Sequence, residues 1–217
     1  MLEGGAGTGL ATRALVALGA HVVGFDLSAP MLEHASRNAA GAYTVLADGN
    51  HLPFADGCAD LCCFAQSWHW LDPLDAVPEV ARVLRADGAW AAWWSHPRAD
   101  GTAWFDQYQR LLEHSTSYDR RQRDIDWSRD VAASRRFGPP RRIDVAWRRE
   151  VALDVWMRDE RSKSYIGLLE PHARDALLTS LEAHLRLAFP GGTLTVPYET
   201  WLWIAKCRTN KIGPLRT

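Results

Sequence analysis

The feature that most constrains the fold is a glycine-rich segment near the N-terminus that runs directly into a helix. The string from Glu3 to Gly9 reads EGGAGTG, and residues 10–18 after it have a helical apolar spacing that stops at Gly19. Glycine has no Cβ, so the backbone of such a loop can approach a ligand closely. The helix start behind the loop offers unpaired N–H groups and the positive end of its dipole. The segment therefore predicts a ligand-binding loop at a helix N-terminus.

The first half of the chain alternates strand-like and helix-like segments. Apolar runs typical of buried strands occupy residues 21–25, 43–46, 60–65 and 89–94, and helical patterns occupy 30–38 and 72–85. Ser28 and Asp72 are placed to cap these two helices. Such alternation predicts an α/β fold with a parallel, doubly wound sheet that carries helices on both faces.

The second half is less regular. Its predicted elements are a helix over 102–118, an arginine-rich connector over 119–142, a strand over 143–147 and a helix over 171–189. Residues 193–205 predict a final extended segment. Pro197 interrupts this segment, which suits an edge strand or a bulge better than the centre of a sheet.

The composition is that of an ordinary folded protein, with 47% hydrophobic and 24% charged residues. No apolar stretch approaches the ~20 residues of a membrane-spanning helix. The N-terminal apolar segment contains Glu3 and has no basic residue before it, which argues against a signal peptide. The four cysteines lack a metal-binding spacing and suit buried, reduced thiols. We therefore expect a cytoplasmic protein without a metal site.

The net charge of −1 conceals an arginine-rich block. Residues 120–149 contain ten arginines and four aspartates, whereas residues 1–100 are acidic. Such blocks are more often solvated surface than binding sites, and we favour that interpretation. The alternative is that the block recruits an anionic molecule. Because the whole chain is not basic, nucleic acid is not an expected partner.

Two aspartates follow the glycine loop at the ends of successive predicted strands. Asp26 ends the strand at 21–25, where a carboxylate can accept hydrogen bonds from a ribose diol. Asp48 follows the strand at 43–46 and is placed to meet a purine amino group. Together with the glycine loop, these residues predict a nucleotide-containing cofactor at one edge of the sheet.

This combination resembles the Class I S-adenosylmethionine-dependent methyltransferases. The string EGGAGTG is similar to the first motif of that family, GFDLS over 24–28 to the second, and ADGNHLPF over 47–54 to the third. Within the family, AQSWHW over 65–70 is similar to the small-molecule enzymes of the trans-aconitate methyltransferase-like branch, as are 162–165 and 196–198. The main resemblance covers roughly residues 1–95.

The resemblance implies a Rossmann-like fold and S-adenosyl-L-methionine as cofactor. It further implies transfer of a methyl group to an oxygen, carboxylate or nitrogen of a small molecule. The residues that it assigns to the cofactor are Glu3, Gly5, Ala6, Gly7, Gly9, Asp26, Leu27, Met31, Asp48, Gly49, Ala65 and Gln66. Asp26 would hold the ribose, and Asp48 with the neighbouring backbone would hold the adenine.

The same resemblance implies a division of the chain into three regions. We expect a cofactor-binding core over 1–100, a helical insertion over 101–190 that caps the substrate and adds part of the sheet, and a final strand with a tail over 191–217. Only two residues precede Glu3, whereas a first strand of ~5 residues would precede this acid in the family. We therefore expect the first strand to be largely missing, through an upstream start or a shortened form.

Two alternatives remain open at this point. A shortened sheet would leave unpaired backbone groups beside the loop, which suits a non-catalytic protein that keeps the fold for binding or regulation. An NAD(P)-dependent oxidoreductase shares the glycine loop, but Leu10 stands where the dinucleotide fingerprint has a third glycine or alanine. The oxidoreductase therefore ranks below the methyltransferase.

Methyl transfer is an in-line displacement, so the enzyme chiefly aligns the nucleophile and excludes water. A general base is needed only where the acceptor loses a proton. His69, just after the fourth predicted strand, is the candidate base, and packing between Trp68 and Trp70 is its equally weighted alternative. His51 and His96 are weaker candidates. Most of the neighbouring tryptophans should be core, and one or two could wall a pocket for an aromatic acceptor.

Overall fold

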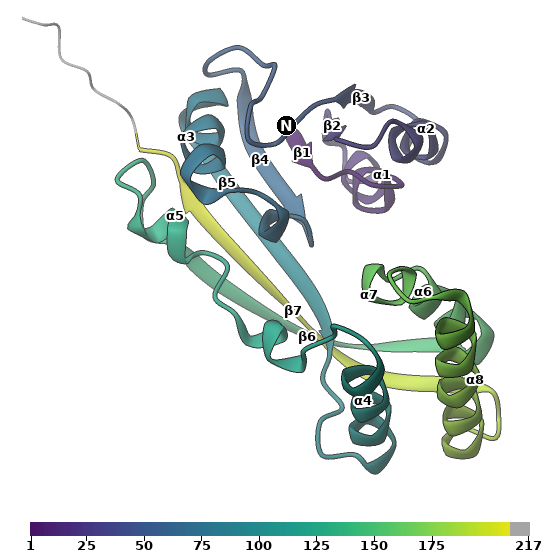
Figure 1. Ribbon diagram of the computed structural model, residues 1–217. Coiled ribbons are helices and arrows are strands. Elements are labelled where there is room, and N and C mark those ends of the chain that lie inside the picture. The colour runs from purple at the N-terminus through teal and green to yellow at the C-terminus, as the bar shows by residue number, and fades with distance from the viewer. Residues whose placement is uncertain (209–217) are drawn as a thin grey trace, which may run out of the picture. The chain divides into compact units, whose positions relative to one another are not determined.

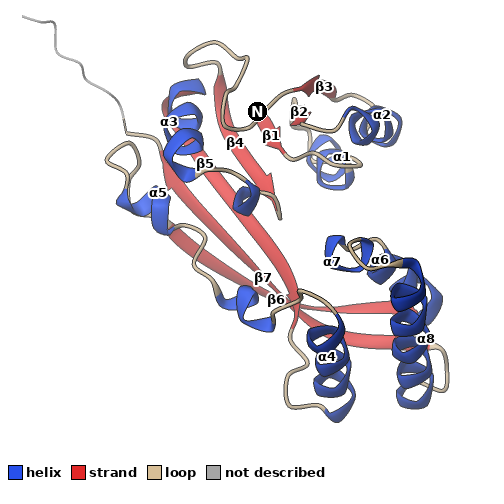
Figure 2. Ribbon diagram, viewed as in Figure 1, coloured by secondary structure: helices blue, strands red, loops and turns tan. Residues whose placement is uncertain are grey.

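The computed structural model describes residues 1–208 as a seven-stranded sheet whose strands are joined by helices (Figures 1 and 2). The strands are β1 (Leu2–Gly4), β2 (Val23–Asp26), β3 (Tyr43–Leu46), β4 (Ala59–Ala65), β5 (Leu84–Pro97), β6 (Arg141–Ala152) and β7 (Thr193–Lys206). Their order in the sheet is β3-β2-β1-β4-β5-β7-β6. The tail expected at the C-terminus falls largely outside the described residues.

The helices lie between these strands in the sequence. The α-helices are α1 (Leu10–Ala17), α2 (Ala29–Asn38), α3 (Pro73–Val83), α4 (Ala103–Ser115), α5 (Arg129–Ala133), α6 (Leu153–Arg161), α7 (Ser164–Gly167) and α8 (Pro171–Ala188). Two 3₁₀ turns, η1 (Trp68–Trp70) and η2 (Arg120–Asp124), complete the described elements. None of these helices combines the length and apolar character that crossing a lipid bilayer requires.

The chain forms two compact units that interrupt each other in sequence. Unit 1 comprises residues 1–94, 126–144 and the chain from 201 onward, and unit 2 comprises 95–125 and 145–200. Each unit has its own apolar core. Phe25, Phe64 and Trp90 are buried in the core of unit 1, and Leu181 and Leu185 are buried in that of unit 2.

The parallel α/β arrangement predicted for the first half is confirmed in unit 1. β1 pairs in parallel with both β2 and β4, β2 pairs with β3, and β4 pairs with β5. The first strand was expected to be largely missing; it is three residues long and still fills an interior position of the sheet, between β2 and β4. Its backbone groups therefore pair on both sides.

Capping residues begin the helices of unit 1 where the sequence predicts. The Ser28 hydroxyl accepts a hydrogen bond from the Met31 N–H at 3.4 Å at the start of α2. The Asp72 carboxylate accepts one from the Leu74 N–H at 2.8 Å at the start of α3. Each bond satisfies one of the N–H groups that a helix start leaves unpaired.

Two of the later strands are longer than predicted. The strand expected at 89–94 is the 14-residue β5, because the Asp87–Gly88 turn is absorbed as a bulge opposite β4. The strand expected at 143–147 extends over the 12 residues of β6. Such extensions depend on pairing partners that are distant in sequence, and the local pattern does not report them.

Pro197 was expected to mark an edge strand or a bulge, and β7 is not an edge strand, because it lies between β5 and β6. The Pro197 carbonyl accepts a hydrogen bond from the Arg98 N–H at 2.7 Å, one residue beyond the end of β5. In an antiparallel ladder the N–H and C=O of one residue face the same neighbour. The donor that proline lacks is therefore missing at the end of a ladder, where the loss is tolerated.

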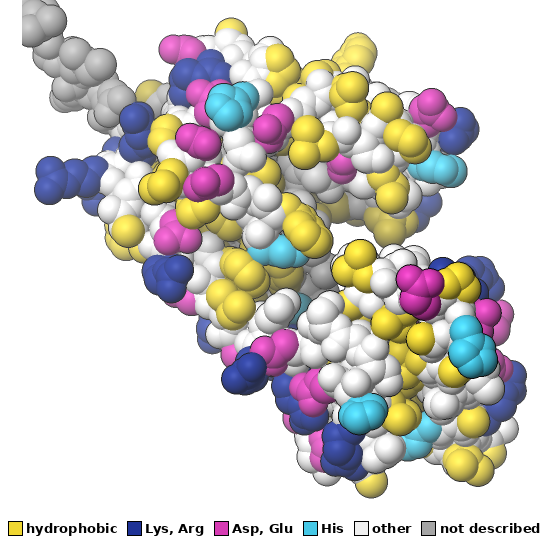
Figure 3. All heavy atoms as spheres, viewed as in Figure 1, with side chains coloured by type: hydrophobic (Ala, Val, Ile, Leu, Met, Phe, Trp, Pro, Cys, Tyr) yellow, Lys and Arg dark blue, Asp and Glu magenta, His cyan; other side chains and the backbone are white. Residues whose placement is uncertain are grey.

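Several members of the arginine-rich block have carboxylate partners within their own unit. In unit 2, Arg120 pairs with Glu113 at 2.7 Å, and the 6% exposed Arg123 pairs with Asp100 at 2.7 Å. In unit 1, the guanidinium of Arg142 lies 4.3 Å from the centroid of the Trp201 ring. Figure 3 shows basic and acidic side chains interspersed on the face in view. Part of the block is thus structural.

Candidate functional site

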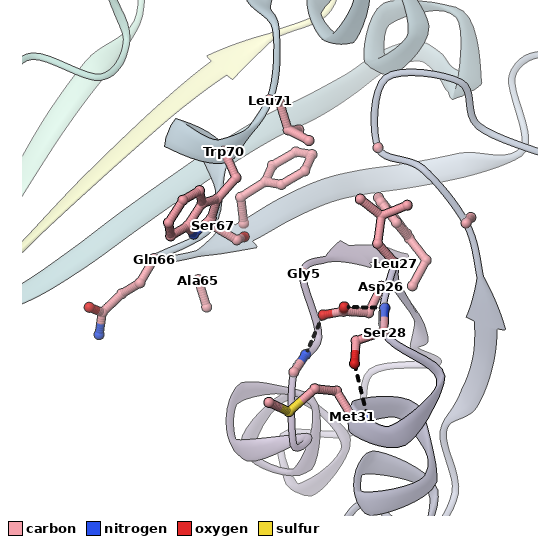
Figure 4. A pocket seen from close by; sticks show the side chains of 15 residues that line it. Gly5, Asp26, Leu27, Ser28, Met31, Ala65, Gln66, Ser67, Trp70 and Leu71 are labelled. Atoms are coloured by element: carbon pink, nitrogen blue, oxygen red, sulfur yellow. Dashed lines mark hydrogen bonds between the residues drawn. The ribbon is translucent and has the colours of Figure 1, made fainter. Parts of the chain in front are cut away.

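A cavity of about 540 Å³ lies in unit 1 at the carboxyl ends of β1, β2 and β4. This is the edge at which open α/β sheets bind ligands. Figure 4 shows the glycine loop, the β2–α2 turn and the segment after β4, which together supply most of the residues around the cavity. The predicted site residues that line it are Gly5, Gly7, Asp26, Leu27, Met31, Gly49, Ala65 and Gln66.

Gly5, Gly7 and Gly9 of the loop have a positive φ, but these three glycines serve different purposes. Gly5 has φ +67°, and a Cβ there would lie under 3.0 Å from the Cβ of Ser67. A Cβ on Gly9, at φ +82°, would lie 2.9 Å from the Cα of Ala35, so Gly9 allows close packing of α1 on α2. A Cβ on Gly7 would meet only the Gly5 oxygen, at 3.9 Å. Gly7 therefore faces open space in the cavity.

The Asp26 carboxylate connects the glycine loop to the β2–α2 turn. One oxygen accepts a hydrogen bond from the Gly7 N–H at 2.9 Å, and the other accepts one from the Ser28 N–H at 2.9 Å (Figure 4). A carboxylate oxygen offers two lone pairs, so each oxygen keeps capacity for one further donor. Asp26 can thus hold the loop and accept hydrogen bonds from a ligand at the same time.

Glu3 and Ala6 lie behind the cavity wall. Glu3 is 1% exposed, and burial raises the pKa of its carboxyl group above 4.5, an effect that Thr12 partly opposes. One of its carboxyl oxygens, Oε2, has no hydrogen-bond partner in the described chain. Ala6 is also buried, and its N–H donates to the Phe25 carbonyl at 3.1 Å. These two residues support the loop from within unit 1.

The Asp48 carboxylate makes its hydrogen bonds within its own turn. Its Oδ1 accepts hydrogen bonds from the backbone N–H of Asn50 at 2.9 Å and from the Asn50 side chain at 3.0 Å. Its other oxygen lies 3.8 Å from His51, which is exposed. The flanking Ala47 and Gly49 line the cavity, whereas Asp48 itself does not. The backbone of this turn therefore forms the wall.

His69 lies in η1, among tryptophan rings. Its ring centroid is 4.8 Å from that of Trp70, 5.4 Å from that of Trp127 and 6.0 Å from that of Trp94. The Trp94 indole N–H donates to Nδ1 at 3.4 Å, which assigns the proton of the neutral ring to Nε2. Loss of surrounding water lowers the pKa of His69 below 6.5. His69 does not itself line the cavity.

The cavity also contains residues that sequence reasoning missed. They are Phe25, Ser28, Ala47, Phe64, Ser67, Trp70 and Leu71. Phe25, Ser28 and Ala47 lie inside the motif strings at 24–28 and 47–54, with Ser28 also expected to cap a helix, and Phe64 adjoins the predicted Ala65. Ser67, Trp70 and Leu71 enter through the turn after β4, and the available signal was that this turn follows a strand ending at the ligand-binding edge.

The electrostatic character of the cavity is set by Asp26. No lysine or arginine lines it, and most of the other lining side chains are apolar. The residues of the described chain contain no group of three or more His, Cys, Asp or Glu side chains suited to a metal ion. The arrangement can hold a ligand that carries donors for Asp26 and apolar surface for the remaining wall.

Comparison with known proteins finds sequence similarity to methyltransferases. The sequence profile of the family described as "Methyltransferase domain" matches residues 2–92. An uncharacterised methyltransferase of Mycobacterium tuberculosis (strain ATCC 25618 / H37Rv) is 31% identical over 205 residues, which are 92% of this chain and 80% of the relative. A malonyl-[acyl-carrier protein] O-methyltransferase of Pectobacterium atrosepticum is 34% identical over 130 residues, 53% of this chain and 49% of the relative.

A solved structure extends the likeness to the fold. A protein of Anaeromyxobacter dehalogenans, described as a type II methyltransferase, superimposes with a TM-score of 0.62 at 19% identity. The superposition covers 95% of this chain and 88% of the other. At this level of identity the likeness concerns architecture alone.

Proposed function

The chain belongs to the Class I S-adenosylmethionine-dependent methyltransferases, and from this premise we propose that it methylates a small molecule at the cavity of unit 1. The observation that carries the proposal is the hydrogen bond between Asp26 and the Gly7 N–H at 2.9 Å. This bond places a carboxylate on the same side of one cavity as a glycine backbone that a ligand can approach closely. Both features suit a ligand with a ribose and a charged amino-acid end.

The residues around the cavity fit S-adenosyl-L-methionine. Asp26 keeps free lone pairs for a ribose diol, and the turn at 47–49 offers backbone groups for an adenine. Leu27 and Met31 add apolar surface, and Gly7, which faces open space, leaves room where a side chain would intrude. When bound, the cofactor would supply an electrophilic methyl group on a cationic sulfonium.

The lining of the cavity favours a cationic ligand. Asp26 is its only charged side chain among the described residues, and no basic residue repels a sulfonium. Aromatic rings near the cavity, Trp70 above all, can add cation–π attraction. The protein's own part in the reaction is then to align the acceptor and to keep water out.

His69 is the proposed general base for an acceptor that must lose a proton. In the structure its Nδ1 accepts from Trp94, so it can act as a base only after that 3.4 Å contact is released. A carboxylate acceptor would need no base. The malonyl-[acyl-carrier protein] O-methyltransferase among the relatives acts, by its name, on oxygen, which supports including such acceptors here.

Calorimetric titration of the 217-residue chain with S-adenosylhomocysteine tests the proposal, with NADH as the matched control. We expect saturable binding of S-adenosylhomocysteine at one site per chain and no heat from NADH beyond dilution. Binding of NADH in place of S-adenosylhomocysteine would contradict the proposal, as would the absence of binding by either compound.

A further inference from the structure

Two hydrogen-bonding side chains that line the cavity, those of Gln66 and Trp70, make no hydrogen bond to the described part of the protein. Apart from the indole of Trp70, the polar side chains that line the cavity are those of Asp26, Ser28, Gln66 and Ser67. Asp26, Ser28 and Ser67 each bond to backbone groups of unit 1. Within the described chain, the Gln66 carboxamide has no hydrogen-bond partner. A carboxamide has both donors and an acceptor, so Gln66 can hydrogen bond to a neutral polar group that either accepts or donates.

The backbone at Gln66 is strained. Its φ is +57°, in the left-handed region that residues with a Cβ rarely adopt. The Gln66 N–H is bonded to the Trp93 carbonyl at 2.9 Å, which fixes this conformation at the end of β4. Among residues 1–208 the other non-glycine with positive φ is Asp87, whose short side chain tolerates the region better. A glycine at position 66 would relieve this strain.

The Gln66 side chain is directed away from the part of the cavity assigned to the cofactor. Figure 4 shows it on the far side of Ala65, pointing away from Gly5 and Asp26. Trp70 lies on the same side of the picture and is 70% exposed, so its ring offers a flat apolar surface. The sequence-based prediction gave Gln66 to the cofactor, whereas this orientation favours the acceptor.

The charge of the cavity restricts what the acceptor can carry. An anionic group entering the cavity would lose water without meeting a lysine or arginine, and it would approach Asp26. A neutral group that hydrogen bonds to Gln66 avoids both penalties. A ring or chain attached to it can cover the Trp70 indole.

We propose that Gln66 determines acceptor specificity: it binds a neutral hydroxyl or similar group of an acceptor whose apolar ring packs on Trp70. The inference rests on the proposed function, because it assumes that the cofactor occupies the Asp26 side of the same cavity. The acceptor class that Gln66 would select is a neutral aromatic or apolar alcohol.

The test uses 2-naphthol and 2-naphthoate, which share a ring system and differ in the neutral or anionic group. Each is titrated into the full chain saturated with S-adenosylhomocysteine, and quenching of tryptophan fluorescence gives the dissociation constant. We expect 2-naphthol to bind at least fivefold more tightly than 2-naphthoate. Equal affinities, or no binding of 2-naphthol to the complex, would overturn the proposed substrate class.

Variants locate the preference at position 66. Gln66→Leu keeps the side-chain volume without its hydrogen bonds, and we expect it to weaken 2-naphthol binding about three- to tenfold, the scale of one neutral hydrogen bond. The matched control is Gln122→Leu, at an exposed glutamine in η2 of unit 2. Because any residue with a Cβ is strained at φ +57°, Gln66→Gly provides a second test. It should unfold at a higher temperature and still lose the preference for 2-naphthol.

Measurements of S-adenosylhomocysteine affinity separate this inference from the proposed function. We expect its dissociation constant to stay within twofold of the parent value in Gln66→Leu and Gln66→Gly. A parallel loss of S-adenosylhomocysteine and 2-naphthol affinity would return Gln66 to the cofactor and overturn the inference. If the parent chain itself fails to bind S-adenosylhomocysteine, the proposed function fails.

Discussion

The hydroxyl of Ser67 donates a hydrogen bond of 2.6 Å to the carbonyl oxygen of Gly4. This bond joins the turn after β4 to the end of β1, two segments separated by more than 60 residues of sequence. It holds the Ser67 side chain against the backbone of Gly5, where no Cβ could be placed. The glycine loop is therefore shaped by its neighbour across the sheet as well as by its own sequence.

Gly5→Ala should damage both the fold and the site. Alanine at φ +67° costs about 1 kcal/mol in backbone strain, and its Cβ would collide with Ser67. We expect the affinity for S-adenosylhomocysteine to fall about tenfold or more, measured by calorimetry, as the loop moves. Gly19→Ala is the control, because Gly19 also has a positive φ, +86°, but a Cβ added there would have no neighbouring atom within 4 Å. Equal affinities in the two variants would show that the contact with Ser67 is unimportant.

Asp26→Ala should weaken S-adenosylhomocysteine binding by ~1–3 kcal/mol, because the ligand and two backbone N–H groups lose their acceptor. Calorimetry of the variant beside Asp75→Ala, an exposed aspartate of α3, measures the effect. A dissociation constant as low as that of the control variant would rule out the proposed placement of the ribose.

His69→Ala should destabilise unit 1 by about 1–2 kcal/mol, since three tryptophan rings lose a neighbour and the Trp94 N–H loses its acceptor. Urea unfolding measures this change, with His34→Ala on the exposed face of α2 as the control. S-adenosylhomocysteine affinity should be unaltered. A His69 that served only as a base would leave the free energy of unfolding unchanged.

His96 should make the stability of the chain depend on pH. Burial, followed by the positive charges of Arg98 and Arg123, lowers the pKa of His96 to about 4, although Asp124 opposes this. Between pH 4 and 6.5 the unfolded chain therefore binds about one more proton at this position than the folded chain, and the free energy of unfolding falls as the pH falls through that window. Above pH 6.5 the His96 ring is neutral in both the folded and the unfolded chain, so it no longer lowers the free energy of unfolding.

Urea unfolding at pH 7.5 and pH 5.0 checks the effect of His96. His96→Gln should show a smaller loss of stability between the two pH values than the parent chain, whereas His34→Gln should show the parent's loss. An NMR titration in which the His96 ring protonates near pH 6.5 would contradict the expectation directly.

Features set by local sequence were predictable. The glycine loop, the caps at Ser28 and Asp72 and the position of Asp26 follow from residues within a few positions of one another, and the structure places them as expected. The helix at 171–189 was also predictable, because its apolar spacing repeats over several turns, and α8 ends within one residue of the prediction.

Features set by distant contacts were not predictable. Ser67 acquires its role only when β4 lies beside β1, and the lengths of β5 and β6 depend on neighbours in the sheet. Asp48 shows the same limit: its position at a strand end was identified, but the carboxylate bonds to Asn50 two residues away. The sequence pattern gives the place of a residue along a strand, and the direction of its side chain depends on local competition for hydrogen bonds.

The position of β7 between β5 and β6 has a consequence for how the protein is made. During synthesis β5 and β6 leave the ribosome before the strand that must separate them, so they cannot take their final places until residues 193–206 have emerged. Trp203, which is buried in the core of unit 1, arrives in the same late segment. Until β7 is in place, β5 and β6 each keep an edge whose backbone groups lack their final partner, and such edges are sites where strands of other chains can pair.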